Sequence, residues 1–158
     1  MAMNFIKYTA HAVAGSSKLK ATTAGHIYNV LVTSETLDNG TIIGLGDYVE
    51  PELYKEAAAP TTFEGVVEDI AANGNYYVRV TKPEGALLVL TVPEAYYNYT
   101  TQMTAESNFY NAKGDIARAY ELYANDVFEL SKEGFTGAFA KGDKVTVDTS
   151  TKKLKKGE

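Results

Sequence analysis

Residues 38–49, DNGTIIGLGDYV, place three glycines beside an apolar run, a composition that can form a phosphate-binding loop. A P-loop requires a lysine and a serine or threonine directly after its glycines, to reach the phosphates and Mg²⁺. Gly46 is followed instead by Asp47, whose carboxylate would repel a phosphate. A dinucleotide-binding fingerprint requires GxGxxG opening into a helix, whereas this stretch reads GxxxGxG. We therefore interpret the glycines as turn or bulge positions.

The chain has two histidines and no cysteine, so few of its residues could bind a metal ion or act as a nucleophile. His11 and His26 match no metal-ligand spacing such as HExxH, and no GxSxG nucleophile motif occurs. We expect His26 to lie at a strand edge rather than to act as a general base. The Asp/Asn-Gly pairs lack the spaced ligands of an EF-hand and are interpreted as turns. The sequence predicts no metal and no cofactor.

Paired carboxylates are the remaining residues that could do chemistry. Glu68 adjoins Asp69, and Glu50 lies two residues before Glu52. A general acid and base must converge in a cleft, and adjacency in the sequence does not bring that about. In an acidic chain such pairs are typical of a solvated surface. We expect a protein that is not an enzyme, with a small carboxylate-dependent hydrolase as the enzymatic alternative.

The distribution of charge separates the ends of the chain from its middle. Residues 21–131 carry 16 acidic and 5 basic side chains, whereas the two ends together carry 4 acidic and 10 basic side chains. An acidic middle repels phosphates, so we expect no nucleic-acid partner. The basic ends suit an acidic partner surface. No uncharged apolar run is long enough to span a membrane, and the N-terminus is no clear secretory signal, so we expect a soluble, unprocessed chain.

Strand-forming segments separated by glycine and asparagine turns recur along the 158 residues. Strands are predicted at 26–33, 41–45, 76–80, 86–92, 115–122, 126–131 and 144–148. The run ALLVLTV lacks alternation, so that strand is expected to be buried on both faces. In the last strand Val145 and Val147 are expected to point inward. Twelve tyrosines suit half-buried sheet faces and protein interfaces.

Three other assignments concern how these segments connect. Residues 61–74 show helical spacing with a capping box, which favours a short helix, although a strand turning at residues 73–75 fits equally. Residues 115–123 could also form an amphipathic helix. Residues 82–85, KPEG, are interpreted as a hairpin-like loop, and 41–45 as a strand returning after the Asn39-Gly40 turn.

The prediction is a mainly β fold, a small barrel or sandwich with one or two short helices and an extended N-terminal arm. Residues 1–24 are assigned to a basic arm because they contain few bulky side chains. Residues 25–149 form the β-rich domain, and residues 150–158 form a basic C-terminal tail.

The succession HIYNVLVT, LDNGTIIGLGDY, ALLVLTVPEAYY, FYNAKGDIARAYEL and DVFELSKEGFTGAFAKGDKVTVD resembles small structural proteins of tailed bacteriophages and prophages. More specifically, it resembles head proteins that decorate or cement the capsid. The resemblance implies a virion protein on the exterior of the phage head, with the major capsid protein as partner. It also implies homo-oligomers, with a trimer at symmetry axes as one expected form. It implies no site motif.

The arm supplies the candidate capsid-binding residues. Lysines without neighbouring acids could contact an acidic capsid surface, and apolar side chains could anchor the arm there. These candidates are Phe5, Ile6, Lys7, Tyr8, Lys18 and Lys20. The alternative function is a host-attachment or carbohydrate-binding module of a tail or head fibre, with Tyr96, Tyr97 and Tyr99 as stacking platforms.

Overall fold

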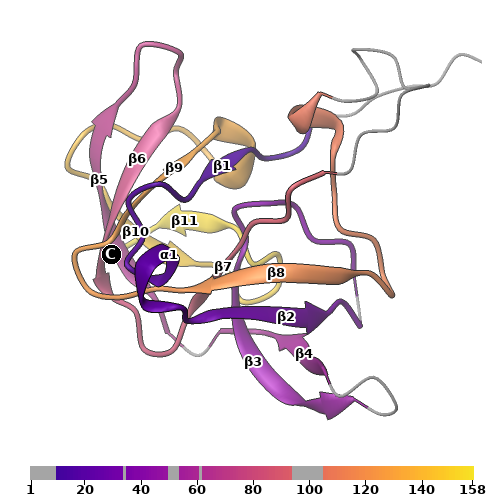
Figure 1. Cartoon of the computed structure of the whole chain (residues 1–158). Coiled ribbons are helices and arrows are strands. Elements are labelled where there is room, and N and C mark those ends of the chain that lie inside the picture. Colours follow the sequence, from indigo (N-terminus) through magenta and orange to yellow (C-terminus); the bar gives the residue numbers. More distant parts are fainter. Residues whose placement is uncertain (1–9, 34, 50–53, 61, 94–104) are drawn as a thin grey trace, which may run out of the picture.

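A computed structural model describes residues 10–33, 35–49, 54–60, 62–93 and 105–158. They form a mainly β structure in which a closed five-stranded barrel adjoins a six-stranded sheet (Figure 1). The helical elements are short: α1 (Ala21–Ala24) and two 3₁₀ turns, Glu106–Asn108 and Lys132–Gly134. The expected mainly β class, with a barrel and few helices, is confirmed.

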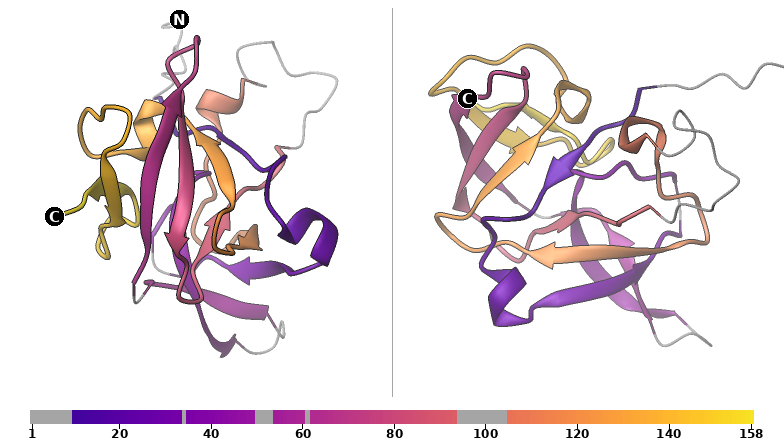
Figure 2. Two further views of the ribbon diagram at one scale, coloured as in Figure 1. Left: turned by 90° about the vertical axis from the view of Figure 1, so that its left-hand side faces the viewer. Right: turned by 45° about the horizontal axis from the view of Figure 1, so that its top comes forward.

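The six-stranded sheet is antiparallel at every pairing. Its order is β1 (Ala14–Gly15), β9 (Val127–Leu130), β6 (Tyr76–Lys82), β5 (Glu64–Ile70), β10 (Lys144–Val147) and β11 (Leu154–Lys156). The β5–β6 hairpin extends past its neighbours at its turn (Figures 1 and 2). Val145 and Val147 are buried whereas Lys144 is exposed, which confirms the predicted alternation of the strand.

The barrel closes in the order β2 (Ile27–Leu31), β4 (Tyr54–Ala58), β3 (Ile42–Val49), β7 (Leu87–Val89) and β8 (Ile116–Glu121). The β2–β4 pair is parallel and the other pairs are antiparallel. β3 does not return to pair with β2, contrary to expectation, because β4 lies between them. Within residues 115–123, Ile116–Glu121 form strand β8 rather than the alternative helix, since β8 pairs with both β2 and β7.

β7 is buried on both faces, as its uniformly apolar sequence predicts. Leu88 packs in the core cluster beneath the six-stranded sheet, whereas Leu87 and Val89 pack in the cluster inside the barrel. Successive side chains of a strand point to opposite faces, so this short strand forms a wall shared by both cores. It joins the barrel to the sheet.

Two predicted connections are wrong. Residues 64–70 form strand β5 rather than a helix, and they pair with β6 across a turn at Gly74, as the strand alternative required. Residues 82–85 do not close a hairpin, because β6 belongs to the sheet and β7 to the barrel. Glu84 and Gly85 have positive φ values of 44° and 78°, and this turn carries the chain from one sheet into the other.

Two of the three glycines of residues 38–49 are turn or bulge positions, as interpreted from the sequence, whereas Gly44 is paired regularly with Ala58 within β3. Gly40 lies in the left-handed region with a φ of 88°. The pairing of β3 with β4 shifts register between Leu45 and Tyr48, which places a bulge at Gly46. A Cβ on Gly46 would lie 2.4 Å from Cγ of Glu56, so a larger residue there would require the Glu56 side chain to move.

Both predicted terminal extensions are wrong for the residues that the structure describes. Residues 1–9 lie outside that part, but Ala12, Leu19 and Ala21 are buried in the sheet core. At the other end β11 pairs with β10, and Leu154 is fully buried. Small side chains contribute to this core through close packing, which a search for bulky residues does not detect.

Two aspartates hold the turns before and after β10. Asp143 accepts the Ala140 N–H at 2.9 Å and forms an ion pair with Lys156 at 3.2 Å. Asp148 accepts the Ser150 hydroxyl at 2.7 Å and the Ser150 N–H at 2.9 Å. The hydrogen bond from the Ala140 N–H, and after it Lys156, lowers the pKa of Asp143. The hydrogen bond from the Ser150 hydroxyl is the main cause of the lowered pKa of Asp148.

These lowered pKa values predict acid sensitivity of the C-terminal part of the sheet. A carboxyl with a lower pKa in the folded state stabilises the fold above its unfolded pKa of about 3.9 and loses that contribution as the pH falls through its folded pKa. We expect Asp148→Asn to reduce the difference in denaturation midpoint between pH 7 and pH 3. An unchanged difference in this variant would contradict the assignment.

Candidate functional site

One wall of the barrel presents apolar side chains to solvent. Ala117 and Ala119 of β8 lie inside the barrel, so Ile116 and Arg118, which alternate with them, point outward. Leu31 of β2 is paired with Ile116, and Ile27 of the same strand also faces outward. The outer side of the wall therefore carries apolar side chains on both strands, with Asn29 of β2 exposed between Ile27 and Leu31 and paired with Arg118.

Residues 90–92 continue this wall on the other side of β8. The Leu90 N–H donates to the Arg118 carbonyl at 2.8 Å, and the Arg118 N–H donates to the Thr91 hydroxyl at 3.0 Å. Val92 and Ile116 then line one shallow hollow of about 390 Å³, together with Phe109. We call the surface formed by Ile27, Leu31, Val92, Ile116 and Arg118 the barrel face.

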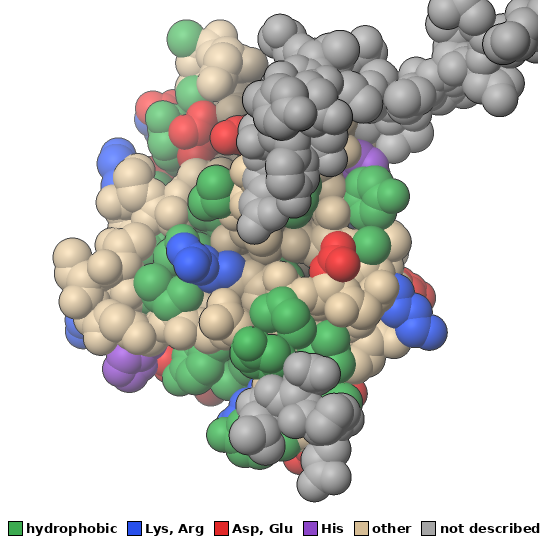
Figure 3. Space-filling model, turned by 45° about the vertical axis from the view of Figure 1, so that its right-hand side comes forward, with side chains coloured by type: hydrophobic (Ala, Val, Ile, Leu, Met, Phe, Trp, Pro, Cys, Tyr) green, Lys and Arg blue, Asp and Glu red, His purple; other side chains and the backbone are tan. Residues whose placement is uncertain are grey.

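The barrel face is unusually exposed for its composition. Val92 is 71% exposed, Ile116 39% and Ile27 36%. Figure 3 shows hydrophobic side chains gathered below the middle of this side of the molecule. Contiguous exposed apolar surface is typical of an interaction site, whereas scattered single residues are not.

A cation lies within the barrel face. Arg118 is exposed and forms no ion pair with any described residue. Arginine at an apolar interface is well suited to pair with a carboxylate of a partner, because its planar guanidinium binds both carboxylate oxygens. The face therefore combines apolar surface with an available positive charge in an otherwise acidic protein.

Lys18 and Lys20, which the sequence analysis assigned to capsid binding, are held over aromatic rings. The Lys18 ammonium lies 5.4 Å from the Tyr77 ring centroid, and the Lys20 ammonium lies 4.9 Å from that of Tyr123. Both side chains are exposed. Cation–π contacts orient such side chains without neutralising their charge. Phe5, Ile6, Lys7 and Tyr8 lie outside the described residues.

Lys20 adjoins one end of the barrel face through Tyr123. The Tyr123 ring also packs against His26, the residue before β2, at a centroid distance of 5.8 Å. The His26 ring donates a 2.7 Å hydrogen bond from Nδ1 to the Glu121 carboxylate at this strand edge, where His26 is expected from the sequence. Partial burial, and then the Glu121 carboxylate, raises the pKa of the Tyr123 hydroxyl above its usual value.

The other residues considered for chemistry serve structure or lie apart. His11 is hydrogen bonded to Asp38 at 2.7 Å, which ties the N-terminal segment to the turn before β3. Glu68 forms an ion pair with Arg79, and Asp69 lies 3.8 Å from Lys141, so each of these carboxylates has a cation beside it. Glu50 and Glu52 lie outside the described residues, as do Tyr96, Tyr97 and Tyr99.

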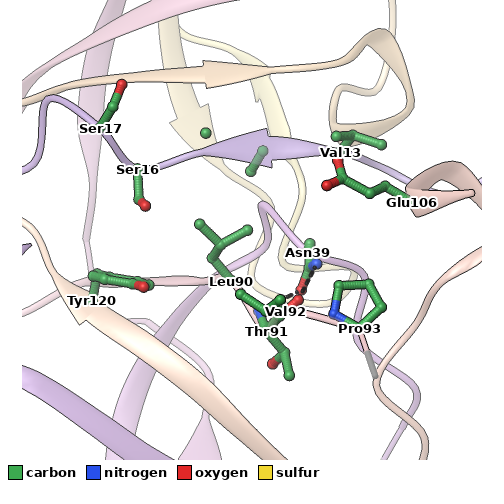
Figure 4. A pocket seen from close by; sticks show the side chains of 12 residues that line it. Val13, Ser16, Ser17, Asn39, Leu90, Thr91, Val92, Pro93, Glu106 and Tyr120 are labelled. Carbon is green, nitrogen blue, oxygen red and sulfur yellow. Dashed lines mark hydrogen bonds between the residues drawn. The ribbon is translucent and has the colours of Figure 1, made fainter. Parts of the chain in front are cut away.

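A slot beside β1 is a second candidate site that sequence reasoning did not identify. It has a volume of about 320 Å³ and lies between residues 13–17 and residues 90–93, with Glu106 at one end (Figure 4). Two segments more than seventy residues apart in the sequence form its walls. No local sequence pattern could have indicated this juxtaposition.

Among the described side chains, no group of three or more His, Cys, Asp or Glu residues could hold a metal ion. No helix in the described part of the chain is long and apolar enough to cross a membrane. Comparison with known protein families, curated proteins and solved structures finds no match.

Proposed function

We propose that the protein is a non-enzymatic structural component of a tailed-phage virion that binds the outer surface of the capsid and decorates or stabilises the head. The observation that carries the proposal is the barrel face, on which Val92 and Ile116 are exposed beside Arg118. Docking this face on a partner removes apolar area from water and brings a carboxylate to the guanidinium. The resemblance to head proteins indicates the class of partner.

The exposed lysines support the same orientation of the protein. Lys20 lies at the Ile27 end of the barrel face through its contact with Tyr123 and the contact of Tyr123 with His26. A capsid exterior with acidic groups would meet Arg118 and Lys20 together. A protein that binds many equivalent sites on a shell stabilises it by mass action, because each bound copy favours the assembled state.

Substitutions on the barrel face test this proposal. We expect Ile116→Asp and Arg118→Glu each to weaken binding to heads of the encoding phage, prepared without this protein, by at least tenfold. The first variant places a charge in the apolar contact, and the second reverses the charge that meets the capsid. Binding is measured by co-sedimentation over a concentration series.

Ile70→Asp is the matched control, because Ile70 is also exposed, at 43%, but lies on β5 in the six-stranded sheet. This variant is expected to bind heads as the unsubstituted protein does. If both barrel-face variants also bind with unchanged affinity, the barrel face is not the capsid contact.

A further inference from the structure

One of the two edges of the six-stranded sheet is formed by β1. The Ser131 N–H donates to the Val13 carbonyl at 2.9 Å, and the Val13 N–H donates to the Ser131 hydroxyl at 2.9 Å. Ala14 is paired with Leu130. In an antiparallel pair, hydrogen-bonded and non-hydrogen-bonded positions alternate, so the N–H and C=O of Ala14 point away from β9. Ala14 itself lines the slot.

The opposite wall of the slot is held in place by Asn39. This buried side chain donates to the Thr91 carbonyl at 2.9 Å and accepts the Thr91 N–H at 2.9 Å. The amide thereby satisfies the main chain of Thr91 and fixes residues 90–93 across the slot from β1 (Figure 4). Leu90, Val92 and Pro93 give this wall an apolar surface.

The slot has the features of a strand-acceptor site. An extended peptide could pair with the outward N–H and C=O of Ala14 while its side chains contact Leu90 and Val92. Natural proteins usually cover or blunt such an edge. Glu106 is the one charged residue among the described residues that line the slot, so the slot favours a segment with a basic side chain.

The chain itself contains a segment of this kind. Residues 1–9, MAMNFIKYT, carry Lys7 and no acidic residue. Phe5, Ile6 and Tyr8 have side chains that favour extended structure. This segment precedes Ala10, the first described residue, and its nine residues can span about 30 Å when extended.

The anchoring of the next residues favours a neighbouring molecule as the recipient. The His11 N–H donates to the Ser107 carbonyl at 2.7 Å, and the Ala12 N–H lies 3.2 Å from an Asp38 carboxylate oxygen. These contacts hold the chain at the Glu106 end of the slot, from where it runs into β1. To fill its own slot, the segment would have to reverse direction within Thr9 and Ala10.

We propose that residues 1–9 of one copy enter the slot of a second copy as an added strand, pairing with Ala14 and placing Lys7 at Glu106. Each copy has one donor segment and one acceptor slot. Reciprocal exchange closes a dimer, and exchange in one direction around an axis closes a ring such as a trimer. Self-association is measured without capsids, so its outcome is separate from that of capsid binding.

A charge exchange in the full-length protein tests the proposed pair. Sedimentation velocity over a concentration series is expected to show an oligomer for the unsubstituted protein. Lys7→Glu and Glu106→Lys should each raise the dissociation constant about tenfold, because each places like charges together. The double variant Lys7→Glu/Glu106→Lys should restore the original constant, which a general loss of folding would not do.

A main-chain variant tests the added strand independently. Ala14→Pro removes the outward N–H without removing a hydrogen bond to β9, and proline is tolerated at such edge positions. It should abolish the oligomer at unchanged thermal stability, whereas the control Ala14→Ser, which keeps the N–H, should still assemble. A monomer at every concentration, or oligomers of Ala14→Pro and Lys7→Glu with unchanged affinity, would overturn the proposal.

Discussion

Gly40→Ala is expected to destabilise the protein by about 3 kcal/mol, from about 1–2 kcal/mol of left-handed backbone strain and about 1–3 kcal/mol of overpacking. Gly40 has a φ of 88°, and a Cβ there would lie 2.1 Å from Cδ1 of Leu130. Leu130 cannot easily move aside, because it is fully buried and also lies against Gly134. For a domain of this size the midpoint of thermal unfolding should fall by roughly 10 °C.

Gly114→Ala is the matched control for Gly40→Ala. Gly114 has a φ of 91°, and a Cβ there would meet no atom within 4 Å. This variant has the backbone strain without the steric clash, so it should lower the free energy of unfolding by only about 1–2 kcal/mol. Equal losses of stability in the two variants would show that Leu130 does not press on Gly40.

A double-mutant cycle identifies the partner in this clash. Leu130→Val shortens the side chain that a Cβ at Gly40 would meet. The Gly40→Ala/Leu130→Val protein should therefore be more stable than the sum of the two single losses predicts, with a coupling of about 1 kcal/mol. If the losses of stability in the two single variants are additive, the strain in Gly40→Ala does not come from contact with Leu130.

Leu87→Ala and Leu88→Ala are each expected to lower the free energy of unfolding by about 3 kcal/mol. The two residues are adjacent in the chain but belong to different cores. Leu87 fills the barrel core, and Leu88 fills the core beneath the six-stranded sheet. Each substitution leaves a cavity in a different cluster, since both side chains are essentially inaccessible to solvent. Chemical denaturation monitored by far-UV circular dichroism measures both losses.

Val92→Ala is the control for these two core variants. Val92 follows β7 in the chain but is 71% exposed, so its truncation should change stability by less than about 0.5 kcal/mol. A small effect for either leucine would contradict the conclusion that β7 is a wall shared by both cores.

The sequence predicted elements whose signal is local. Alternation placed Val145 and Val147 inward, and the uninterrupted apolar run around Leu88 indicated a strand buried on both faces. Both features depend on neighbouring residues in one strand. Neither feature depends on which strands pair with the one that contains it. A single sequence is therefore sufficient to predict both features.

Long-range pairing could not be predicted in the same way. The helical spacing in residues 61–74 is real, but pairing of β5 with β6 and β10 decides the conformation there. The burial of Ala12 and Leu19 likewise depends on a sheet assembled from distant segments. From the sequence alone, a run of small residues does not show whether the segment is an exposed arm or packs closely into a core.

The barrel face was missed for a related reason. Ile116 is apolar and lies in a strand, which by itself predicts burial. Only closure of the barrel, with Ala117 and Ala119 inside, shows that Ile116 and Arg118 point outward. The signal present in the sequence is the alternation of small inward residues with larger outward ones, and its direction becomes clear only in the closed barrel.

The position of the core also determines which truncation can test capsid binding. Removal of residues 1–24 would take Leu19 and Ala21 out of the sheet core, so a loss of binding could reflect unfolding. Removal of residues 1–9 leaves every described residue in place. The contribution of Phe5, Ile6, Lys7 and Tyr8 is therefore measured with this shorter deletion.

Co-sedimentation of the full-length protein with heads of the encoding phage, prepared without it, tests the central claim most directly. The account predicts saturable binding at a fixed ratio to the major capsid protein, and heads that withstand a higher temperature once they are decorated. A folded protein that remains in the supernatant at every concentration, with no change in the stability of the heads, would contradict the claim.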